Sequence, residues 1–482
     1  MDDLSFLSAR ELTRRIKRRT LSSLELVDHF LARIERHNEA VNAVVTLDAE
    51  GARASARRAD EAAARGAWLG PLHGIPLTIK DSFEVAGMRT TCGASVFRDH
   101  VPKQDAIVVQ RLRAAGAILL GKTNTPAFCG DAQTFNAIFG TTHNPWDVTR
   151  TCGGSSGGSA AALATGLTPL EVGSDIAGSI RCPASFCGVL GHKPTYGIIP
   201  GRGHIPGAPG SRSEFDLGVM GPLARHADDL SLLLDVLAGP PPEQASAYRL
   251  QLPAARSHSL RGYRVAAFLD DPSFAVDETV LRCLERAVSA LREAGATVHE
   301  AKPEFAMAEA VAVYRQLLDS VMGSGLPAKV REVLKQQAET GDPSSPLTSF
   351  ARNAHLSHRE WLKAHEQREQ LRVRWARFFE DYDVLLTPVT IVPAFAHDHS
   401  PLQPLRKLQV NGRERHYDDL FAWVSLASIA YLPATSVPVG LTPGGLPVGM
   451  QVIGPYLEDR TPIDFAARVQ ELLGGFQAPP GY

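Results

Sequence analysis

Three residues of the chain could together attack a carbonyl carbon: Lys80, Ser155 and Ser179. Each stands where a loop leaves a strand or enters a helix, since residues 75–80 alternate as a strand does and Ser155 lies in the glycine-rich run 153–158. A serine hydroxyl becomes a strong nucleophile only when a base takes its proton, and a desolvated lysine amine can replace the usual histidine. The two serines and the lysine are therefore candidates for nucleophilic catalysis.

Lys80 taken alone supports a simpler interpretation. Most lysines are solvated, so an exposed Lys80 paired with Asp81 is what the residue type by itself predicts. A catalytic Lys80 would have to be buried beside apolar neighbours, because burial favours the neutral amine that a base requires.

Residues 116–123, GAILLGKT, also satisfy the pattern of a phosphate-binding loop. In such a loop, backbone N–H groups surround the phosphates and a helix follows the lysine. The four middle residues are apolar, which favours a buried strand, and Pro126 opposes a helix directly after the motif. We therefore predict a strand end with a turn at this position and reject nucleotide binding.

Residues 153–157, GGSSG, satisfy the G-x-S-x-G nucleophile elbow, which would make Ser155 the nucleophile with an acid and a histidine downstream. That motif needs a strand that leads straight into it, whereas residues 144–147, NPWD, are rich in turn formers. A glycine-rich loop that opens a helix is the better interpretation of this run.

The first part of the chain is expected to be helical. Within residues 1–70, Ser22 and Glu25 form a capping box ahead of apolar residues at helical spacing, and an alanine-rich helix follows over 48–65. Further on, Asp105 is expected to cap a helix that ends at Ala115.

From residue 71 the sequence alternates short apolar runs with glycine and proline, which predicts strands and tight turns. Residues 300–380 form a charged helical excursion, after which a strand begins at Val384. The chain shows neither internal repeats nor a low-complexity linker, so we predict one α/β domain over residues 1–482.

Composition excludes several classes of partner. Lys and Arg number 50 against 52 Asp and Glu, so no strong positive field is available to bind nucleic acid or an anionic membrane. No apolar run reaches the roughly 20 residues of a membrane-spanning helix. The six cysteines follow no regular framework and no leader-like segment follows Met1, which predicts a soluble protein in the reducing cytoplasm.

The order and spacing of several separate motifs resemble the amidase-signature family. The resemblance extends from about residue 5 to 475 and rests on strings that lie at 74–81, 121–124, 153–159, 173–181, 193–197 and 445–451. It implies a large, mixed, twisted β-sheet covered on both faces by α-helices. It also implies cleavage of a carboxylic amide into an acid and ammonia or an amine.

The resemblance assigns roles to individual residues. Ser179 is the expected nucleophile that carries the acyl group, Lys80 is the general base, and Ser155, which follows a cis peptide in this family, shuttles the proton between them. Ser156 is expected to support this network as a further hydrogen-bond donor, with a purely structural loop serine as the alternative. Ser179 lies just before Pro183, which marks a helix start, so the developing oxyanion would also lie near a positive helix end.

The same resemblance predicts the surroundings of the nucleophile. The backbone N–H groups of residues 176–179 (Ile176, Ala177, Gly178 and Ser179) are the expected oxyanion hole. Asp175 and Arg181 are expected to brace this loop, with a purely local salt bridge as the alternative. Two positions depart from the family: Ala177 replaces the first of two usual glycines, and Ala127 replaces a common glutamate.

The substrate pocket is less determined. Cys129 lies where members of the family line the acyl pocket, and variable segments at 125–135, 300–380 and 390–425 are expected to set selectivity. Aromatic side chains that could line the pocket or belong to the core are Phe128, Phe135, Tyr314, Phe395, Tyr417 and Trp423.

No cofactor or metal is expected. His397 and His399 form an H-x-H string with His416 nearby, but such a string lacks the further ligands of a closed metal site. We expect a small-molecule amide as substrate, no nucleic-acid or membrane partner, and a possible homodimer. The alternative is a transamidating subunit, similar to that of the glutamine-dependent aminoacyl-tRNA amidotransferase, which needs partner chains.

Overall fold

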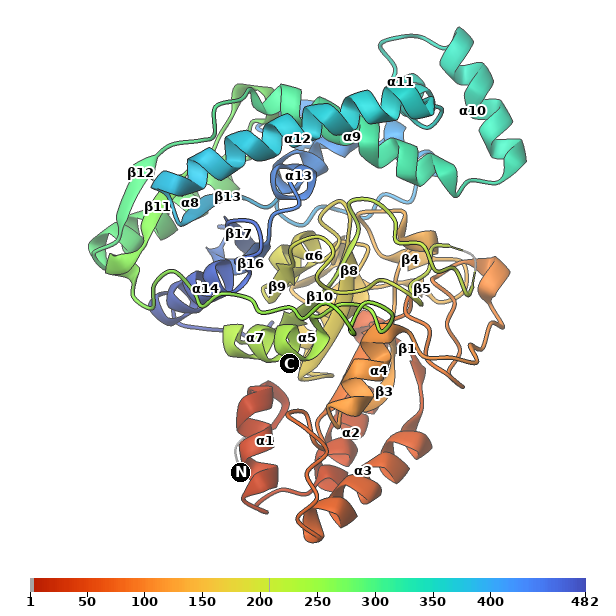
Figure 1. Cartoon of the computed structure of the whole chain (residues 1–482), viewed down its shortest axis with the longest axis vertical. Coiled ribbons are helices and arrows are strands. Elements are labelled where there is room, and N and C mark those ends of the chain that lie inside the picture. The colour runs from red at the N-terminus through yellow and green to blue at the C-terminus, as the bar shows by residue number, and fades with distance from the viewer. Residues whose placement is uncertain (1–3, 208) are drawn as a thin grey trace.

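The computed structural model describes residues 4–207 and 209–482, and a mixed sheet of eight strands runs through its centre (Figure 1). The strands, in spatial order, are β12 (Thr297–Glu300), β11 (Arg264–Ala267), β13 (Val384–Pro388), β17 (Pro447–Ile453), β16 (Ala434–Leu441), β9 (Leu190–Lys193), β10 (Val219–Ala224) and β8 (Leu170–Asp175). β11 pairs in parallel with β12 and β13, and the other pairs are antiparallel.

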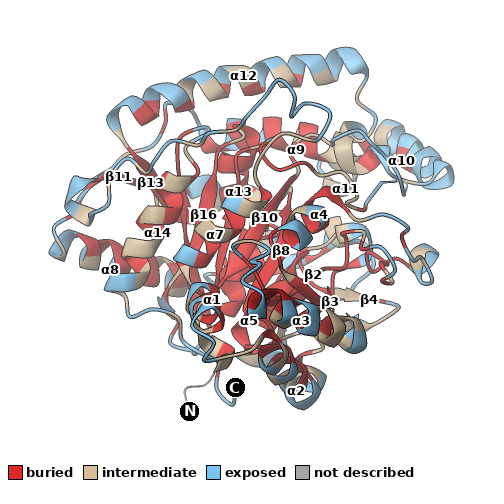
Figure 2. Ribbon diagram, turned by 60° about the horizontal axis from the view of Figure 1, so that its bottom comes forward, coloured by how far each residue is buried: buried red, intermediate tan, exposed pale blue. Residues whose placement is uncertain are grey.

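Helices cover this sheet, and they explain why its strands are so apolar. Every residue of β8, β9, β10, β13 and β17 is buried, as expected for strands that are covered on both faces. The helices that pack on them include α5 (Gly157–Ala164), α6 (Arg181–Cys187), α7 (Ala227–Leu237), α8 (Glu278–Glu293) and α14 (Arg460–Leu472). Figure 2 shows this buried centre and the exposed outer sides of the helices. The predicted fold class is confirmed.

Lys80 belongs to a second, smaller sheet. Its strand β2 (Pro76–Lys80) pairs in parallel with β3 (Ile118–Thr123), which pairs in turn with β1 (Val44–Leu47), and β2 packs beside β8. Every residue of β2 and β3 is buried. The string 116–123 therefore ends in a strand, and Lys122 donates to the Phe83 carbonyl, so this segment has no phosphate-loop geometry.

The helical start of the chain forms as predicted. The described residues of segment 1–70 include α1 (Ala9–Lys17), α2 (Ser23–Val41) and α3 (Ala49–Ala64), while residues 1–3 lie outside the described part. The capping box is present, because the Ser22 hydroxyl accepts from the Glu25 N–H and the Glu25 carboxylate accepts from the Ser22 N–H at 2.8 Å.

The charged excursion is also helical. It consists of α9 (Met307–Ser324), α10 (Ala328–Thr340), α11 (Pro346–Asn353) and α12 (His358–Asp381), which lie together at the top of Figure 1. α9 packs between α12 and α13 (Ala422–Ile429), and so joins the excursion to the body of the protein. The assignment of the whole chain to one domain stays a prediction.

Two local predictions were wrong. Asp105 does not cap α4 (Ile107–Ala114), because its carboxylate accepts from the Ala86 N–H at 2.8 Å and pairs with Arg113. The stretch 144–147 is the tip of a two-stranded ribbon, β6 (His143–Asn144) with β7 (Asp147–Thr151), so a short strand does precede the GGSSG run. That ribbon stands apart from the main sheet.

None of the helices within residues 4–207 and 209–482 has both the length and the apolar character that crossing a membrane requires.

A methyl group at Gly121 should disrupt the small sheet. A Cβ atom there would lie 2.0 Å from the carbonyl oxygen of Thr46, where β1 and β3 shift register, and a backbone oxygen cannot move aside cheaply. We expect Gly121→Ala to lower the free energy of unfolding by about 1–3 kcal/mol in urea titrations. Gly325→Ala is the matched control, since a Cβ there meets nothing within 4 Å. Equal effects of both substitutions would contradict the prediction.

Candidate active site

Lys80 lies at the end of β2 with its side chain fully buried. Its Nζ is 2.6 Å from Ser155 Oγ and 2.9 Å from Ser174 Oγ, and no carboxylate of the described residues lies within ion-pair distance. The neighbouring Asp81 turns instead toward Lys122, at 3.6 Å. Lys80 is therefore not the exposed partner of Asp81, and two serine hydroxyls are the side-chain groups that its amine contacts by hydrogen bonds among the described residues.

Ser155 is held against Lys80 by the loop that precedes α5. The peptide bond between Gly154 and Ser155 is cis, as the resemblance implies, and Ser155 is 1% exposed. The close approach leaves no room for a side chain at Gly154, where a Cβ would lie 2.6 Å from the Asp131 carbonyl oxygen. The structure thus brings Lys80 and Ser155 into direct hydrogen-bond contact from two distant segments.

Ser156 ties the backbones of the site together. Its N–H donates to the Ser179 carbonyl at 3.0 Å, its hydroxyl donates to the Ser174 carbonyl at 3.3 Å, and that hydroxyl accepts from the Ser174 N–H at 3.4 Å. The side chain makes no contact with the hydroxyl groups of Ser155 or Ser179. Its position is that of a brace between the loop before α5 and the end of β8.

Ser179 lies in the turn between β8 and α6, and the helix begins two residues later at Arg181. The residue is 8% exposed, and its hydroxyl makes no hydrogen bond with any residue that the structure describes. The Ser179 carbonyl accepts a hydrogen bond from the N–H of Ser156, the residue after Ser155, and this contact places Ser179 near Ser155. The Ser179 hydroxyl itself is available to a ligand.

The turn before Ser179 presents unpaired backbone donors. The N–H groups of Ile176, Ala177 and Ser179 make no hydrogen bond within the described part of the chain. The expectation for Gly178 was wrong, because its N–H already donates to Asp175 Oδ1 at 2.8 Å. Three of the four expected donors remain available to an oxyanion.

A buried ion pair holds this turn. The Arg181 guanidinium lies 2.8 Å from Asp175 Oδ1 and 3.0 Å from Oδ2. Burial alone would raise the pKa of Asp175, but Arg181 outweighs it and lowers that pKa to about 2. The predicted brace is therefore present, and it is more than local, because Arg181 also donates to the Val424 carbonyl at 2.7 Å and to Gln451 Oε1 at 2.6 Å.

The expected pocket residues divide between site and core. Cys129 is half-buried with its sulfur 3.6 Å from that of Cys92. The Tyr314 hydroxyl donates to the Ile176 carbonyl at 3.0 Å, so this side chain supports the turn. Trp423 is fully buried and donates to a backbone carbonyl. Of the other aromatic side chains, Phe128 is exposed, Phe135 is half-buried, and Phe395 is half-buried and packs against the core.

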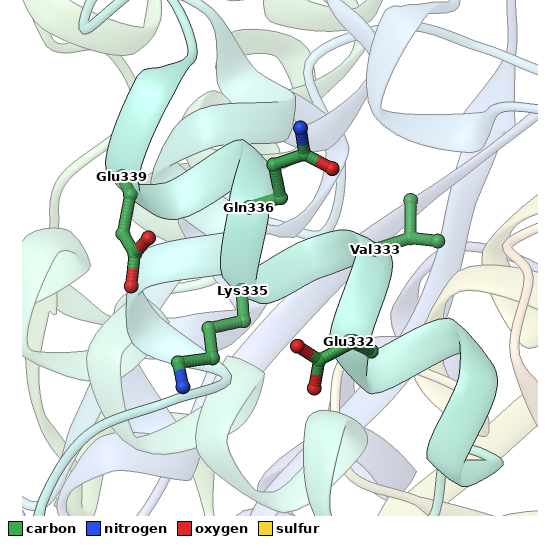
Figure 3. A pocket seen from close by; sticks show the side chains of 5 residues that line it. All are labelled: Glu332, Val333, Lys335, Gln336 and Glu339. Carbon is green, nitrogen blue, oxygen red and sulfur yellow. The ribbon is translucent and has the colours of Figure 1, made fainter.

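Tyr417 is buried as well, and its hydroxyl donates to Asp131 at 2.8 Å. The hollow in Figure 3 lies elsewhere, on α10, between side chains such as Glu332, Lys335 and Glu339. It contains no group that contacts Lys80 or the two serines, so it has no part in their chemistry.

Two residues of the site were not assigned a role from the sequence. Ser174 lies within the string 173–181 and contacts Lys80. The sequence does not show this contact, because it depends on how β8 packs against β2. His204 lies in an irregular segment and has its Nε2 2.8 Å from Ser174 Oγ. No periodicity or motif marks His204.

Comparison with known proteins identifies relatives over nearly the whole chain. A family model described as Amidase matches residues 25–462. A relative from Carboxydothermus hydrogenoformans, named as the A subunit of glutamyl-tRNA(Gln) amidotransferase, is 33% identical, and the alignment covers 99% of each chain. Among solved structures, a bacterial aryl acylamidase of the amidase-signature family has a TM-score of 0.82 with 25% identity, over 97% of this chain and 96% of that one.

A further solved structure is the A subunit of glutamyl-tRNA(Gln) amidotransferase from Thermotoga maritima, with a TM-score of 0.77 and 26% identity over 99% of this chain and 98% of that one. These names overturn one expectation from the sequence. We expected a chain that acts on a small-molecule amide with no nucleic-acid or membrane partner and at most a second copy of itself. The expectation of a chain that acts alone or with a second copy of itself was wrong, because relatives of nearly full length are named as subunits of a tRNA amidotransferase.

Removal of Arg181 should be strongly destabilising. In Arg181→Met the carboxylate of Asp175 would stay buried without its partner, and breaking such a pair costs about 3–5 kcal/mol. The matched control is Arg282→Met, whose partner Glu278 is 69% exposed, and we expect it to cost less than about 1 kcal/mol. Urea titrations at neutral pH measure both. Similar losses for the two variants would show that the buried pair does not brace the turn.

Proposed function

The chain belongs to the amidase-signature family, and we propose that it cleaves the C–N bond of a carboxylic amide through an acyl-enzyme on Ser179. The observation that carries this proposal is the 2.6 Å contact between Lys80 Nζ and Ser155 Oγ, in a buried site without a carboxylate. An amine in that position is suited to take a proton from a hydroxyl group.

The proposed first step moves two protons and forms one bond. Lys80 takes the proton of Ser155, Ser155 takes that of Ser179, and Ser179 Oγ attacks the amide carbon. Ser179 makes no hydrogen bond to Ser155 in the structure, and catalytic contacts of this kind often tighten only around a bound substrate. The negative charge develops on the former carbonyl oxygen, and the N–H groups of Ile176, Ala177 and Ser179 are placed to stabilise it.

The second step breaks the C–N bond. Lys80 returns a proton through Ser155 to the leaving nitrogen, which departs as ammonia or an amine and leaves the acyl group on Ser179. Water then attacks the ester by the same route, and the acid is released as Ser179 regains its proton. Each group ends in its starting state, so the cycle needs no cofactor.

We further propose that the chain acts as the amide-cleaving subunit of a glutamine-dependent aminoacyl-tRNA amidotransferase. Relatives that carry that subunit's name are 33–35% identical over at least 93% of this chain, which supports this role over that of an independent hydrolase. The ammonia of the second step would then serve as the product that a partner chain consumes. The six cysteines are free thiols, which supports a cytoplasmic location for this work.

A fluorophosphonate should label Ser179. Such reagents react with an activated serine hydroxyl, so peptide mass spectrometry of the treated protein should find the adduct on Ser179, and Lys80→Met should abolish it. Lys103→Met, at an exposed lysine, is the matched control and should label as the unmodified protein does. An adduct on Ser155 would instead support the nucleophile elbow and would contradict the proposed roles.

Release of ammonia from glutamine should depend on partners. We expect the purified chain to be slow alone and to accelerate at least about ten-fold when candidate partner subunits and aminoacylated tRNA are added, because subunit coupling is commonly of that size. A coupled glutamate dehydrogenase assay measures the ammonia. Ser179→Ala should abolish the accelerated rate. Rapid turnover of simple amides by the chain alone, without acceleration of glutaminase activity, would exclude the subunit role.

A further inference from the structure

A histidine lies behind the lysine, on the side of Ser174. Lys80 Nζ is 2.9 Å from Ser174 Oγ, and Ser174 Oγ is in turn 2.8 Å from His204 Nε2. The serine comes from β8, and the histidine from the segment between β9 and β10. Beyond the proposed proton path through Ser155, the lysine is thus connected to one more titratable group.

Lys80, Ser174 and His204 form a row of hydrogen-bonded groups, and the hydrogen-bonding capacity of each group constrains the direction of its hydrogens. A neutral lysine amine has two N–H groups and one lone pair, and the lone pair must face the Ser155 hydroxyl to accept its proton. One N–H is then available to Ser174 Oγ. When Ser174 accepts from Lys80, its own hydrogen needs an acceptor, and His204 Nε2 is the other group within hydrogen-bond distance of that hydroxyl.

This arrangement requires His204 to be neutral with Nε2 unprotonated. Its proton then lies on Nδ1, which is buried without a hydrogen-bond partner at normal distance among the described residues. Burial is the main cause that lowers the pKa of His204, and the nearby Cys129 sulfur opposes it. The positive charge of Lys122 on β3 acts in the same direction as burial, as does Lys80 on β2 whenever it is protonated. The neutral form is therefore the ordinary form near neutral pH.

We propose that His204 is a positioning residue, which acts through Ser174 to aim the lone pair of Lys80 at Ser155. By accepting the hydrogen of Ser174, the imidazole fixes the rotation of that hydroxyl and leaves its oxygen to hold one N–H of the amine. The rotation of the amine about its last bond is fixed in consequence. This inference rests on the proposed function of Lys80 as a base.

Protonation of His204 would reverse the direction of the hydrogen bonds in this row. An imidazolium donates from Nε2 to Ser174, so the hydrogen of Ser174 turns toward Lys80 and competes with Ser155 for the lone pair. The lysine is then misdirected even while it is neutral. Nucleophile activation therefore requires the loss of two protons at acid pH, one from Lys80 and one from His204.

The test is the pH dependence of the rate at which a fluorophosphonate labels Ser179, which needs no knowledge of the substrate. For the unmodified protein, the logarithm of this rate should rise with a slope of about two at acid pH and about one above the pKa of His204. In His204→Gln, whose amide oxygen can accept but does not titrate, the slope should be about one throughout. His204→Phe should label about ten-fold more slowly than the unmodified protein above the pKa of His204, because the hydroxyl of Ser174 loses its acceptor.

The controls separate positioning from folding. His100→Gln alters a histidine that binds Glu84 at 3.0 Å, outside the row, and should keep the slope of two. Circular dichroism at each pH shows that the compared variants are folded. A slope of two in His204→Gln overturns the inference while the proposed function stands. If the unmodified protein is not labelled at Ser179, the proposed function fails, and the inference fails with it.

Discussion

The structure depends on burying one amine. Lys80 lies at the end of a strand with no exposure to solvent, and among the described residues two serine hydroxyls are its hydrogen-bond partners, with no carboxylate within ion-pair distance. The two hydroxyls that contact the amine come from the loop before α5 and from the end of β8. The small sheet must therefore pack correctly against the large sheet for the amine to find its hydrogen-bond partners. The same packing that completes the core therefore positions the amine.

The turn that carries Ser179, between β8 and α6, differs from the surroundings of Lys80. Here charge is buried with its partner, and Asp175 and Arg181 are held as an ion pair that also uses the N–H of Gly178. This use of Gly178 leaves neighbouring N–H groups unpaired, and unpaired donors are rare in a protein interior. A turn that keeps donors free must be held rigid by other contacts, and the guanidinium and the Tyr314 hydroxyl supply them. A buried amine and a buried ion pair thus lie within one loop of each other.

Much of this could be predicted from the sequence because it is local. The capping box at Ser22, the strand that ends at Lys80 and the mixed sheet follow from short patterns and from the family resemblance. The roles of Lys80, Ser155 and Ser179 remain predictions that the geometry supports. What the sequence could not reveal is tertiary: the backbone donor that draws Asp105 away from its helix, the carboxylate that occupies Gly178, and the approach of His204 to Ser174. The proposed role beside partner chains leaves no local pattern either, and it rests on the names of the relatives.

The hydrogen bonds of Arg181 also bear on how the chain is made. Lys80, Ser155 and Ser179 are all translated before Arg181. The Arg181 guanidinium, which braces the turn that holds Ser179, nevertheless binds Gln451, 270 residues further on. During synthesis from the N-terminus, the early segment can emerge and collapse long before that amide exists. A nascent chain therefore carries the lysine and both serines without a finished turn. The turn that holds Ser179 therefore gains this contact only after β17 has been synthesised, near the end of translation.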